Sequence, residues 1–350
     1  MRVVVVGATG NVGTSTAQAL AADVRITSIL GIARRRPRLR IDKTEWARAD
    51  VADADLAGLF RGADAVVHLA WLFQPTHTPA ITWRANVAGS ARVFQAVADA
   101  GVPALVYASS VGAYSPGPRD DRPVDESWPT HSWPTAAYGR EKAYVERMLD
   151  AFQAEHPDRR VVRMRPGFIF KRESASGQRR LFAGPFLPNP LVRPGLIPVV
   201  PDVPGLRFQA LHTDDAAEAY RLAVTEDVRG PFNLAADPVI GPDELAQLLH
   251  ARRIRLPARG AKAALSIAWE LGLVPASPQL LDLALHLPVM DTTRARTELG
   301  WTPRYSALDA LRQFLDGLRS GAGMDTPPLS PETGGPMRLR ELVTGVGRRL

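Results

Sequence analysis

The chain has 350 residues, of which 45% are hydrophobic and 23% are charged, and it contains no cysteine. This composition is typical of a soluble globular protein with a core domain and a smaller appendage. Disulfides, thiolate metal sites and cysteine nucleophiles are excluded. The formal net charge is +7, but outside residues 34–40 the arginines are scattered, and no nucleic-acid-binding motif accompanies them. We therefore expect no nucleic-acid partner.

The N-terminal segment passes from a short apolar run directly into glycines, without the long apolar region and cleavage site of a signal peptide. No uncharged run approaches the roughly 18 apolar residues that indicate a membrane span. The most apolar stretch, 263–274, is interrupted by Glu270. We therefore expect a cytoplasmic protein that does not associate with a membrane.

Short apolar runs alternate with helical patterns over the first two-thirds of the chain. The expected strands are residues 2–6, 25–33, a short run before Asp50, 65–70, 104–110 and 160–166. The expected helices between them are residues 11–22, 86–100 and 137–152. This alternation predicts an α/β fold, a Rossmann-type doubly wound parallel sheet with helices on both faces. Ligands bind such a sheet beyond the carboxyl ends of its strands.

The pattern changes after Pro166. Residues 171–206 are rich in proline and glycine and predict a long, functional or mobile loop. Further helices are expected at 214–225, 241–252, within 261–288 and at 306–318, with a strand at 232–236. We expect a nucleotide-binding domain of residues 1–166 plus about 207–236, a mainly C-terminal substrate-binding region of 167–206 plus 237–320, and a weakly ordered tail over 321–350.

A glycine loop, GATGNVG (7–13), joins the first expected strand to the first expected helix. Gly7 permits a tight turn, Gly10 leaves room for a pyrophosphate, and Gly13 lets the helix pack closely on the sheet. The N–H groups and dipole of the following helix favour phosphate. The loop residues that we interpret as cofactor-binding are Gly7, Thr9, Gly10, Asn11, Val12 and Gly13.

The end of the second strand bears on which dinucleotide is bound. NAD-binding loops of this kind are followed, roughly 20 residues later, by an acid that binds the adenosine ribose. Here the strand ends in Ala33-Arg34-Arg35, with no acid at its tip. Arg34 and Arg35 would suit a 2′-phosphate, so we favour NADP over NAD as cofactor. The alternative is that these arginines form a solvated surface.

Three residues form a candidate catalytic group. Tyr138 and Lys142 are four residues apart in an expected helix, so their side chains share a face. A free tyrosine has a pKa of about 10; a nearby ammonium group and an oxidised nicotinamide favour the phenolate, so Tyr138 can act as general acid or base. Lys142 is expected to lower that pKa and hold the nicotinamide ribose. Ser109 and Ser110 end a strand where a serine hydroxyl can polarise a carbonyl.

In this order, the motifs resemble those of extended short-chain dehydrogenase/reductases of the NAD(P)-dependent epimerase/dehydratase family. The resemblance spans roughly residues 1–318 and is carried by GATGNVG (7–13), Asp50-Val51, HLA (68–70), NVAGS (86–90), VYASSVGAY (106–114), YGREK (138–142), RPG (165–167), LHTDDAA (211–217) and LGWTP (299–303). It implies that Ser110, rather than Ser109, is catalytic.

The resemblance also implies further contacts and an assembly. Asp50 and Val51 would contact the adenine, Leu69 and Ala70 would line the cofactor channel, and Pro166 would lie by the nicotinamide. A homodimer through helices such as those near 86–100 and 137–152 is implied as well. For His212, with Asp214 and Asp215 nearby, the resemblance implies a structural bend rather than a metal site, and we expect no metal. Trp71 and Phe73 are candidates for either substrate contact or core packing.

The chain departs from two patterns of that family. Val111-Gly112 stands where sugar-nucleotide dehydratases carry an Asp-Glu pair, so such an elimination is disfavoured. Sugar-nucleotide epimerases carry an asparagine after the sixth strand and an arginine before the His-x-x-Asp segment. Here RPG (165–167) replaces the first, and Arg207 is offset by one position. The RPG motif resembles that of family members that act on apolar carbonyl compounds. The apolar segments 186–200 and 263–288 are candidates to line a pocket for such a compound.

We therefore expect hydride transfer between NADP(H) and a carbonyl or alcohol carbon, with Tyr138 exchanging the proton and Ser110 orienting the substrate oxygen. One alternative is a sugar or sugar-nucleotide epimerase that retains its cofactor. Another, from a different class, is a non-catalytic protein that senses the dinucleotide. The segments that would decide the substrate, 171–206 and 263–288, carry no motif.

Overall fold

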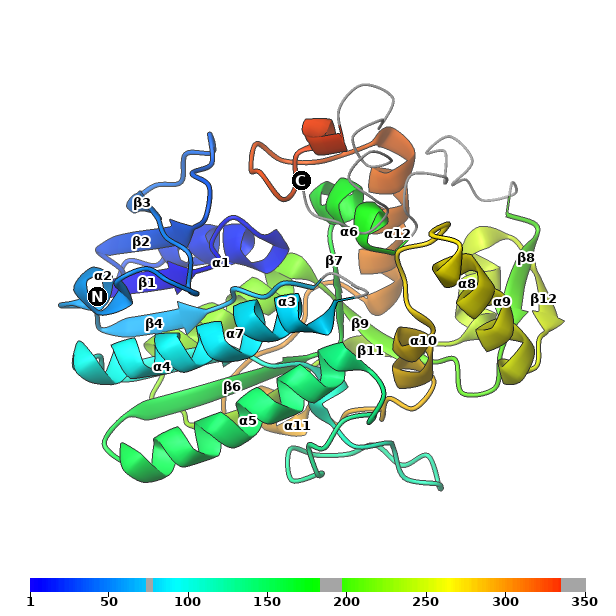
Figure 1. The fold of residues 1–350 in the computed structure, drawn as a ribbon, viewed down its shortest axis with the longest axis horizontal. Helices are drawn as coiled ribbons and strands as arrows, with labels where there is room; N and C mark the ends of the chain where they lie inside the picture. Colours follow the sequence, from blue (N-terminus) through cyan, green and yellow to red (C-terminus); the bar gives the residue numbers. More distant parts are fainter. Residues whose placement is uncertain (74–77, 183–196, 335–350) are drawn as a thin grey trace.

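The computed structural model describes residues 1–73, 78–182 and 197–334 (Figure 1). Its first elements are β1 (Arg2–Val6), α1 (Asn11–Ala22), β2 (Ser28–Ala33), β3 (Thr44–Arg48), α2 (Leu56–Phe60), β4 (Ala65–His68), α3 (Pro79–Trp83), the π-helical turn η1 (Arg84–Ala88), α4 (Gly89–Asp99), β5 (Ala104–Ala108), the 3₁₀ turn η2 (Val111–Ala113), α5 (Ala137–Glu155) and β6 (Arg160–Pro166).

The remaining elements build the last strand of the main sheet and a smaller region beside it. They are β7 (Phe168–Phe170), the 3₁₀ turn η3 (Arg172–Ser174), α6 (Ala175–Phe182), β8 (Val199–Asp202), β9 (Phe208–His212), α7 (Thr213–Thr225), β10 (Gly230–Leu234), β11 (Ala236–Ile240), α8 (Pro242–Leu249), β12 (Arg252–Arg255), α9 (Ala258–Glu270), α10 (Pro278–Ala284), α11 (Thr293–Thr297), α12 (Ala307–Ser320) and the 3₁₀ turn η5 (Pro331–Gly334).

The main sheet has seven parallel strands in the order β10-β6-β5-β4-β1-β2-β3. From β1 the chain runs outward through β2 and β3, then returns to β4 on the other side of β1 and runs outward again. The order therefore reverses between β1 and β4, where doubly wound sheets bind ligands. This architecture confirms the predicted Rossmann-type fold.

Both faces of the sheet are buried because successive side chains of each strand point to opposite sides. Val3 and Val5 pack with α1 and α7, and Tyr220 of α7 is fully buried on this side. Val4 and Val6 pack on the other side, with Phe94 and other residues of α2, α4 and α5. Helices α4 and α5 cover the face that is turned toward the viewer in Figure 1. The continuous valine run at residues 3–6 is thus the signature of a strand that is covered twice.

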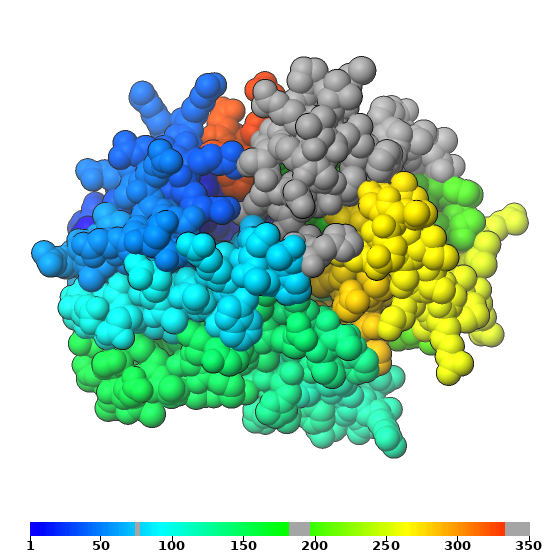
Figure 2. Space-filling view, viewed as in Figure 1, coloured from blue at the N-terminus to red at the C-terminus, as the bar shows by residue number. Residues whose placement is uncertain are grey.

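Beside the main sheet lie a three-stranded sheet, β11-β9-β7, and a two-stranded pair, β12-β8. Helices α8, α9 and α10, drawn in yellow to gold, lie on the right in the view of Figures 1 and 2, whereas the N-terminal strands lie on the left. The proposed division into a nucleotide-binding domain and a substrate-binding region stays a prediction. Within the described residues, no helix is both long and apolar enough to cross a membrane.

Two expectations differ from the structure. Residues 175–182, expected in a loop, form helix α6, because Ala175 packs against Leu318, Phe314 and Leu315 of the distant α12. Residues 321–334, expected to be weakly ordered, fold back over the molecule, with Thr326 and Leu329 buried. In both segments the ordering contacts come from parts of the chain far away in the sequence. Residues 183–196 and 335–350 of these segments lie outside the described residues.

Candidate active site

A cavity of about 1060 Å³ opens at the carboxyl ends of β1, β4, β5 and β6, where the strand order reverses. Every residue predicted from the sequence to bind cofactor or to act in catalysis lines this cavity. These residues are Gly7, Thr9, Gly10, Asn11, Val12, Gly13, Arg34, Arg35, Asp50, Val51, Leu69, Ala70, Ser110, Tyr138, Lys142 and Pro166. Their roles are argued below as proposals.

The glycine loop has the geometry of a pyrophosphate cradle. A Cβ atom on Gly13 would lie 2.3 Å from the carbonyl oxygen of Gly7, so only glycine lets α1 begin this close to β1. A Cβ on Gly10 would meet nothing nearer than 3.5 Å, so that glycine faces open space. The N-terminus of α1 has no side-chain cap, which leaves its first N–H groups available to an anion. The loop therefore fits a dinucleotide.

The adenosine end of the cavity is lined by Arg34, Arg35, Asp50 and Asp53. Arg34 and Arg35 are exposed, and no hydrogen bond or ion pair of their side chains is found in the described part of the chain. Asp50 accepts a hydrogen bond from the Ala52 N–H at 3.0 Å, which orders the turn after β3. Two guanidinium groups without side-chain partners among the described residues thus line this end of the cavity.

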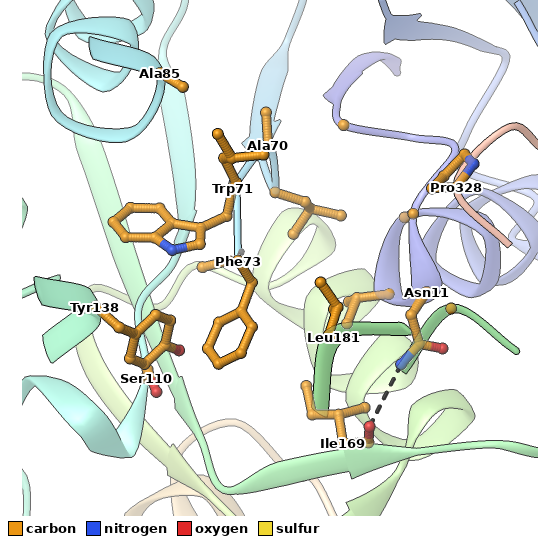
Figure 3. Close-up of a pocket in the computed structure, with 18 of the residues that line it drawn as sticks. Asn11, Ala70, Trp71, Phe73, Ala85, Ser110, Tyr138, Ile169, Leu181 and Pro328 are labelled. Atoms are coloured by element: carbon orange, nitrogen blue, oxygen red, sulfur yellow. Dashed lines mark hydrogen bonds between the residues drawn. The ribbon is translucent and has the colours of Figure 1, made fainter. Parts of the chain in front are cut away.

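Ser110 and Tyr138 meet on one wall of the cavity (Figure 3). Ser110 follows β5 and accepts a hydrogen bond from the Gly112 N–H at 3.0 Å, which fixes its side chain. Burial raises the pKa of Tyr138 to about 12, and its hydrogen bond with Ser110 acts in the opposite direction. A Cβ on Gly112 would lie 2.9 Å from Tyr138 Cε1. Glycine at position 112 therefore makes room for the tyrosine ring.

Lys142 is held by contacts that its sequence spacing does not predict, and its expected effect on the Tyr138 pKa stays a prediction. Its Nζ donates to the Ala108 carbonyl oxygen at 2.6 Å and lies 3.5 Å from the centre of the Trp71 ring. Burial also holds the Lys142 pKa well below its ordinary value, although Glu146 and Glu141 act against this. The ammonium is directed at a carbonyl and an aromatic face, which sequence spacing could not reveal.

A buried ionic network lies behind the site. Ser109 donates to Glu146 Oε1 at 2.6 Å, and Arg165 makes a bidentate pair with Glu146 at 2.9 and 3.0 Å. Arg163 reaches the same carboxylate at 3.0 Å. Burial raises the Glu146 pKa, but the hydrogen bonds and charges of its partners, Arg165 first, outweigh this and lower it to about 2. The network clamps α5, which carries Tyr138 and Lys142, to β5 and β6.

Aromatic residues crowd the tyrosine from the β4 side. The Phe73 and Trp71 rings approach the Tyr138 ring edge-on, with centroids 4.5 and 6.1 Å away. Both line the cavity and are partly exposed, and Trp71 also packs against the core between the sheet and α4. Sequence reasoning missed other lining residues, for which no motif exists: Phe168, Ile169, Phe170, Gln178, Arg180, Leu181, Pro327, Pro328 and Leu329.

The polar side chains of the segment with His212 bond to the backbone of neighbouring residues. The His212 ring accepts a hydrogen bond from the Asp214 N–H at 3.2 Å, caps α7 and stacks near Tyr305. Asp215 is buried and accepts from the Tyr305 N–H. In the described residues no group of three or more metal-ligating side chains comes together.

The parallel sheet and glycine loop define the class, an α/β protein with a Rossmann-type nucleotide-binding fold. The model of the NAD dependent epimerase/dehydratase family matches residues 3–235. The chain therefore belongs to this family, which confirms the resemblance seen in its motifs.

Sequence relatives include both characterised and uncharacterised proteins. A 4-hydroxy-2-methyl-3-oxo-4-farnesyl-3,4-dihydroquinoline-1-oxide ketoreductase of Stigmatella aurantiaca is 30% identical over 72% of this chain and 77% of its own length. An uncharacterised protein of Mycobacterium tuberculosis is 24% identical over 84% of this chain and 77% of its own length. Another from that organism is 27% identical over 93% of this chain, but the match covers only 31% of its length.

Solved structures with the same fold are more distant in sequence. UDP-glucose-4-epimerase from Stenotrophomonas maltophila, with bound NAD and formylated UDP-arabinopyranose, has a TM-score of 0.68 and 21% identity over 91% of this chain and 98% of that one. UDP-glucose 4-epimerase from Thermotoga maritima with UDP-glucose has a TM-score of 0.69 and 17% identity over 91% and 99%. At this identity the likeness establishes the fold.

Proposed function

We propose that this protein is an oxidoreductase that transfers a hydride between a nicotinamide dinucleotide and a carbonyl or alcohol carbon. The observation that carries the proposal is that Ser110 and Tyr138 lie together on one wall of the cavity that the glycine loop also lines (Figure 3). The Stigmatella relative, a ketoreductase by its name, supports this reaction class.

The bound cofactor supplies the hydride in reduction and accepts it in oxidation. In reduction, a C–H bond forms at the substrate carbon, the C=O π bond breaks, and the Tyr138 phenol gives its proton to the substrate oxygen. Ser110 donates a hydrogen bond to that oxygen and stabilises its developing charge. Oxidation reverses each step, so Tyr138 then accepts the proton. Trp71 and Phe73 pack on the Tyr138 ring and keep water from it.

NADP is the cofactor that we propose in preference to NAD. The support is the pair of exposed guanidinium groups, Arg34 and Arg35, at the adenosine end of the cavity, since guanidinium groups bind phosphate with two parallel hydrogen bonds. Titration with NADPH and NADH tests this preference. We expect tighter NADPH binding, which Arg34→Ala weakens without changing NADH binding. The preference for NADP is overturned if NADPH and NADH bind with equal affinity and Arg34→Ala changes neither affinity.

Replacement of Tyr138 by phenylalanine tests the reaction. We expect turnover to fall by at least about 100-fold, as for a lost acid–base group, while NADPH affinity stays near that of the unchanged protein. The readout is NADPH oxidation with a panel of ketones, with fluorescence titration for binding. Full activity of the variant contradicts the mechanism.

The same experiments separate the alternatives. A cofactor-retaining epimerase would purify with bound nucleotide and interconvert a sugar or sugar-nucleotide without net NADPH consumption. A dinucleotide-sensing protein would bind cofactor tightly and turn over no member of the panel.

We also propose a homodimer through α4 and α5. The half-exposed rings of Trp83, at the end of α3, and Tyr144, on α5, contact each other with centroids 4.9 Å apart. Light scattering of the Tyr144→Glu variant tests this proposal.

A further inference from the structure

The part of the cavity beyond Tyr138 is lined almost entirely by hydrocarbon. Its apolar side chains come from the β4 loop, α3, η2, β7, α6, α9 and α10, elements that are far apart in the sequence. They are Trp71, Leu72, Phe73, Ile81, Val111, Phe168, Leu181, Leu265, Leu280, Leu281, Leu283, Ala284 and Leu287. Of the segment 263–288, most of the lining residues therefore come from the second half, from Ala276 onward.

Few charged residues line the cavity. Four, Arg34, Arg35, Asp50 and Asp53, lie at the adenosine end. Of the other three in the described lining, Lys142 lies under Trp71, Arg180 donates to the Pro328 carbonyl oxygen at 2.5 Å, and Arg84 is exposed to solvent. Among the described residues, the cations at the hydrocarbon wall are therefore Lys142, whose ammonium is taken up by Ala108 and Trp71, and the exposed or bonded Arg84 and Arg180.

The polar residues before His212 do not supply a phosphate site either. Arg207, the candidate nearest to a diphosphate-binding position, pairs with Asp121 at 2.5 Å and is absent from the cavity lining. The Gln209 amide exchanges hydrogen bonds with the Met290 backbone at 3.0 and 2.7 Å. Among the described residues, neither Arg207 nor Gln209 is therefore available to balance the charge of a diphosphate in this chamber, and burying an unpaired charge is costly in free energy.

We propose that the chamber binds a hydrocarbon-rich ketone or secondary alcohol, with its carbonyl or hydroxyl at Tyr138 and Ser110 and its apolar body against α10. This proposal deepens the proposed function and rests on it. Leu280, Leu281 and Ala284 lie on neighbouring turns of α10 and provide an unbroken apolar contact surface. A sugar-nucleotide would find hydrocarbon where it needs cations.

A series of methyl ketones from 2-butanone to 2-decanone tests the proposal with the full chain and saturating NADPH. We expect kcat/KM to rise roughly two- to fourfold for each added CH₂, because each methylene is removed from water on binding. Leu281→Asn is expected to flatten this dependence. The matched control is Leu285→Asn, which introduces the same amide on the same helix at a residue that does not line the cavity.

The two failures are distinguishable. No NADPH oxidation with any ketone or aldehyde overturns the proposed function. Oxidation of NADPH with a chain-length dependence that is flat, or equal effects of Leu281→Asn and Leu285→Asn, overturns only the apolar substrate class. Interconversion of UDP-glucose and UDP-galactose overturns it as well.

A separate observation concerns the segment after α12, residues 321–332, which we call the C-terminal strap. Figure 1 shows it in orange-red, returning from α12 toward β2 and β3. The Arg38 N–H donates to the Asp325 carbonyl oxygen at 3.2 Å, and on the other side the Ser176 N–H donates to Ala322 at 3.2 Å. Arg180 donates to the Pro328 carbonyl oxygen. The strap is thus tied both to the arginine-rich loop and to α6.

The middle of the strap reaches the cofactor side of the cavity. Pro327, Pro328 and Leu329 line it together with Gly10 and Arg34. In Figure 3, Pro328 lies beside Asn11, on the opposite side from Ser110 and Tyr138. Leu329 is buried, and its N–H and carbonyl close a turn with Thr326 and Met324. This is an internally bonded loop that lines the cavity together with residues of the glycine loop.

We infer that the strap forms part of the binding site for the adenosine–pyrophosphate half of the cofactor and slows its release. The comparison is between a chain ending at Ser320 and a control ending at residue 334, both checked for folding by circular dichroism and thermal melting. We expect the shorter chain to lose at least about tenfold in affinity for NADPH and for 2′,5′-ADP, with a faster NADPH off-rate. The control should match the full chain.

Equal off-rates and affinities in the shorter chain and the control overturn this inference. If the shorter chain fails to fold, Arg180→Met in the full chain removes the bond to Pro328 and is expected to raise the NADPH off-rate in the same direction. An unchanged off-rate in that variant then overturns the inference. Loss of nicotinamide mononucleotide binding without loss of 2′,5′-ADP binding contradicts it too.

Discussion

The Ser109 hydroxyl donates to Glu146 Oε1 at 2.6 Å, which turns this serine toward the interior, whereas its neighbour Ser110 lies with Tyr138 on the cavity wall (Figure 3). The two serines therefore have different partners, although the sequence alone offers both as strand-end hydroxyls. One partner is a buried carboxylate and the other is the candidate acid–base group. This difference leads to the first prediction.

Ser110→Ala is expected to lower kcat by about 10²- to 10³-fold, the effect of losing one donor to a developing oxyanion, with little change in stability. Ser109→Ala removes a partner of the buried Glu146, so we expect it to lower the free energy of unfolding by about 1–3 kcal/mol while kcat stays within a fewfold. Steady-state kinetics and urea unfolding of both variants measure this. The reverse assignment of the two effects would refute it.

Glu146→Gln leaves Arg165 buried without its charged partner, since both bonds of that guanidinium pair go to Glu146. Loss of one partner of a buried ion pair costs about 3–5 kcal/mol of stability. Arg163 keeps its bond to Asp150 at 2.7 Å and suffers less. Urea unfolding measures the loss. The double variant Glu146→Met with Arg165→Met, which removes both charges, should be more stable than Glu146→Gln; a double variant that is less stable would contradict the argument.

His68 predicts a specific acid sensitivity. Burial first, and the charge of Lys142 second, lower its pKa from 6.5 to about 3, and its Nε2 lies 2.9 Å from Ser90 Oγ. A depressed pKa means that the unfolded chain binds the proton more readily. The contribution of neutral, buried His68 to the free energy of unfolding is therefore complete above pH 6.5 and is lost as the pH falls toward 3. Between pH 6.5 and about 5 this loss is about 2 kcal/mol.

Urea unfolding of His68→Gln at several pH values measures this contribution. The amide can keep a hydrogen bond with Ser90, but it does not titrate, so the variant should lose less stability than the unchanged protein over the same pH range. Identical pH slopes for the two proteins would show that other groups are responsible.

The sequence predicts best what depends on local spacing. The run of valines at residues 3–6 predicts a doubly covered strand, and the glycine loop and the Tyr138–Lys142 spacing predict residues that do line one cavity. These features depend on a few neighbouring residues on regular elements. The order of the motifs along the chain also indicates the family, and the match to the family model confirms it.

What the sequence does not reveal depends on contacts between distant segments. The direction of the Lys142 ammonium depends on Ala108 and Trp71, which lie on two other strands or their loops. The strap over the cofactor site depends on Arg38 and Arg180, far from it in the sequence. Its prolines and glycines are typical of a disordered tail, because composition records local stiffness and not the bonds that hold a segment in place.

The pH dependence of the two directions of the reaction should differ, because they need opposite forms of Tyr138. With its pKa raised to about 12 by burial, Tyr138 is protonated at neutral pH and ready to donate. Ketone reduction should therefore be independent of pH from about 6 to about 9. Alcohol oxidation needs the phenolate, whose fraction rises tenfold per pH unit below the pKa, so kcat/KM should rise with a slope of about one.

Oxidised nicotinamide adds a positive charge near the phenol and lowers its pKa, so the oxidation profile should level off well below pH 12. Both profiles are measured at saturating cofactor, with Tyr138→Phe as the control, whose residual oxidation should lack the slope. A slope that persists in Tyr138→Phe would assign the proton to another group. So would a reduction rate that already decreases with increasing pH under pH 9 while the oxidation rate increases. His68, neutral and bonded to Ser90, is excluded from that role by its burial.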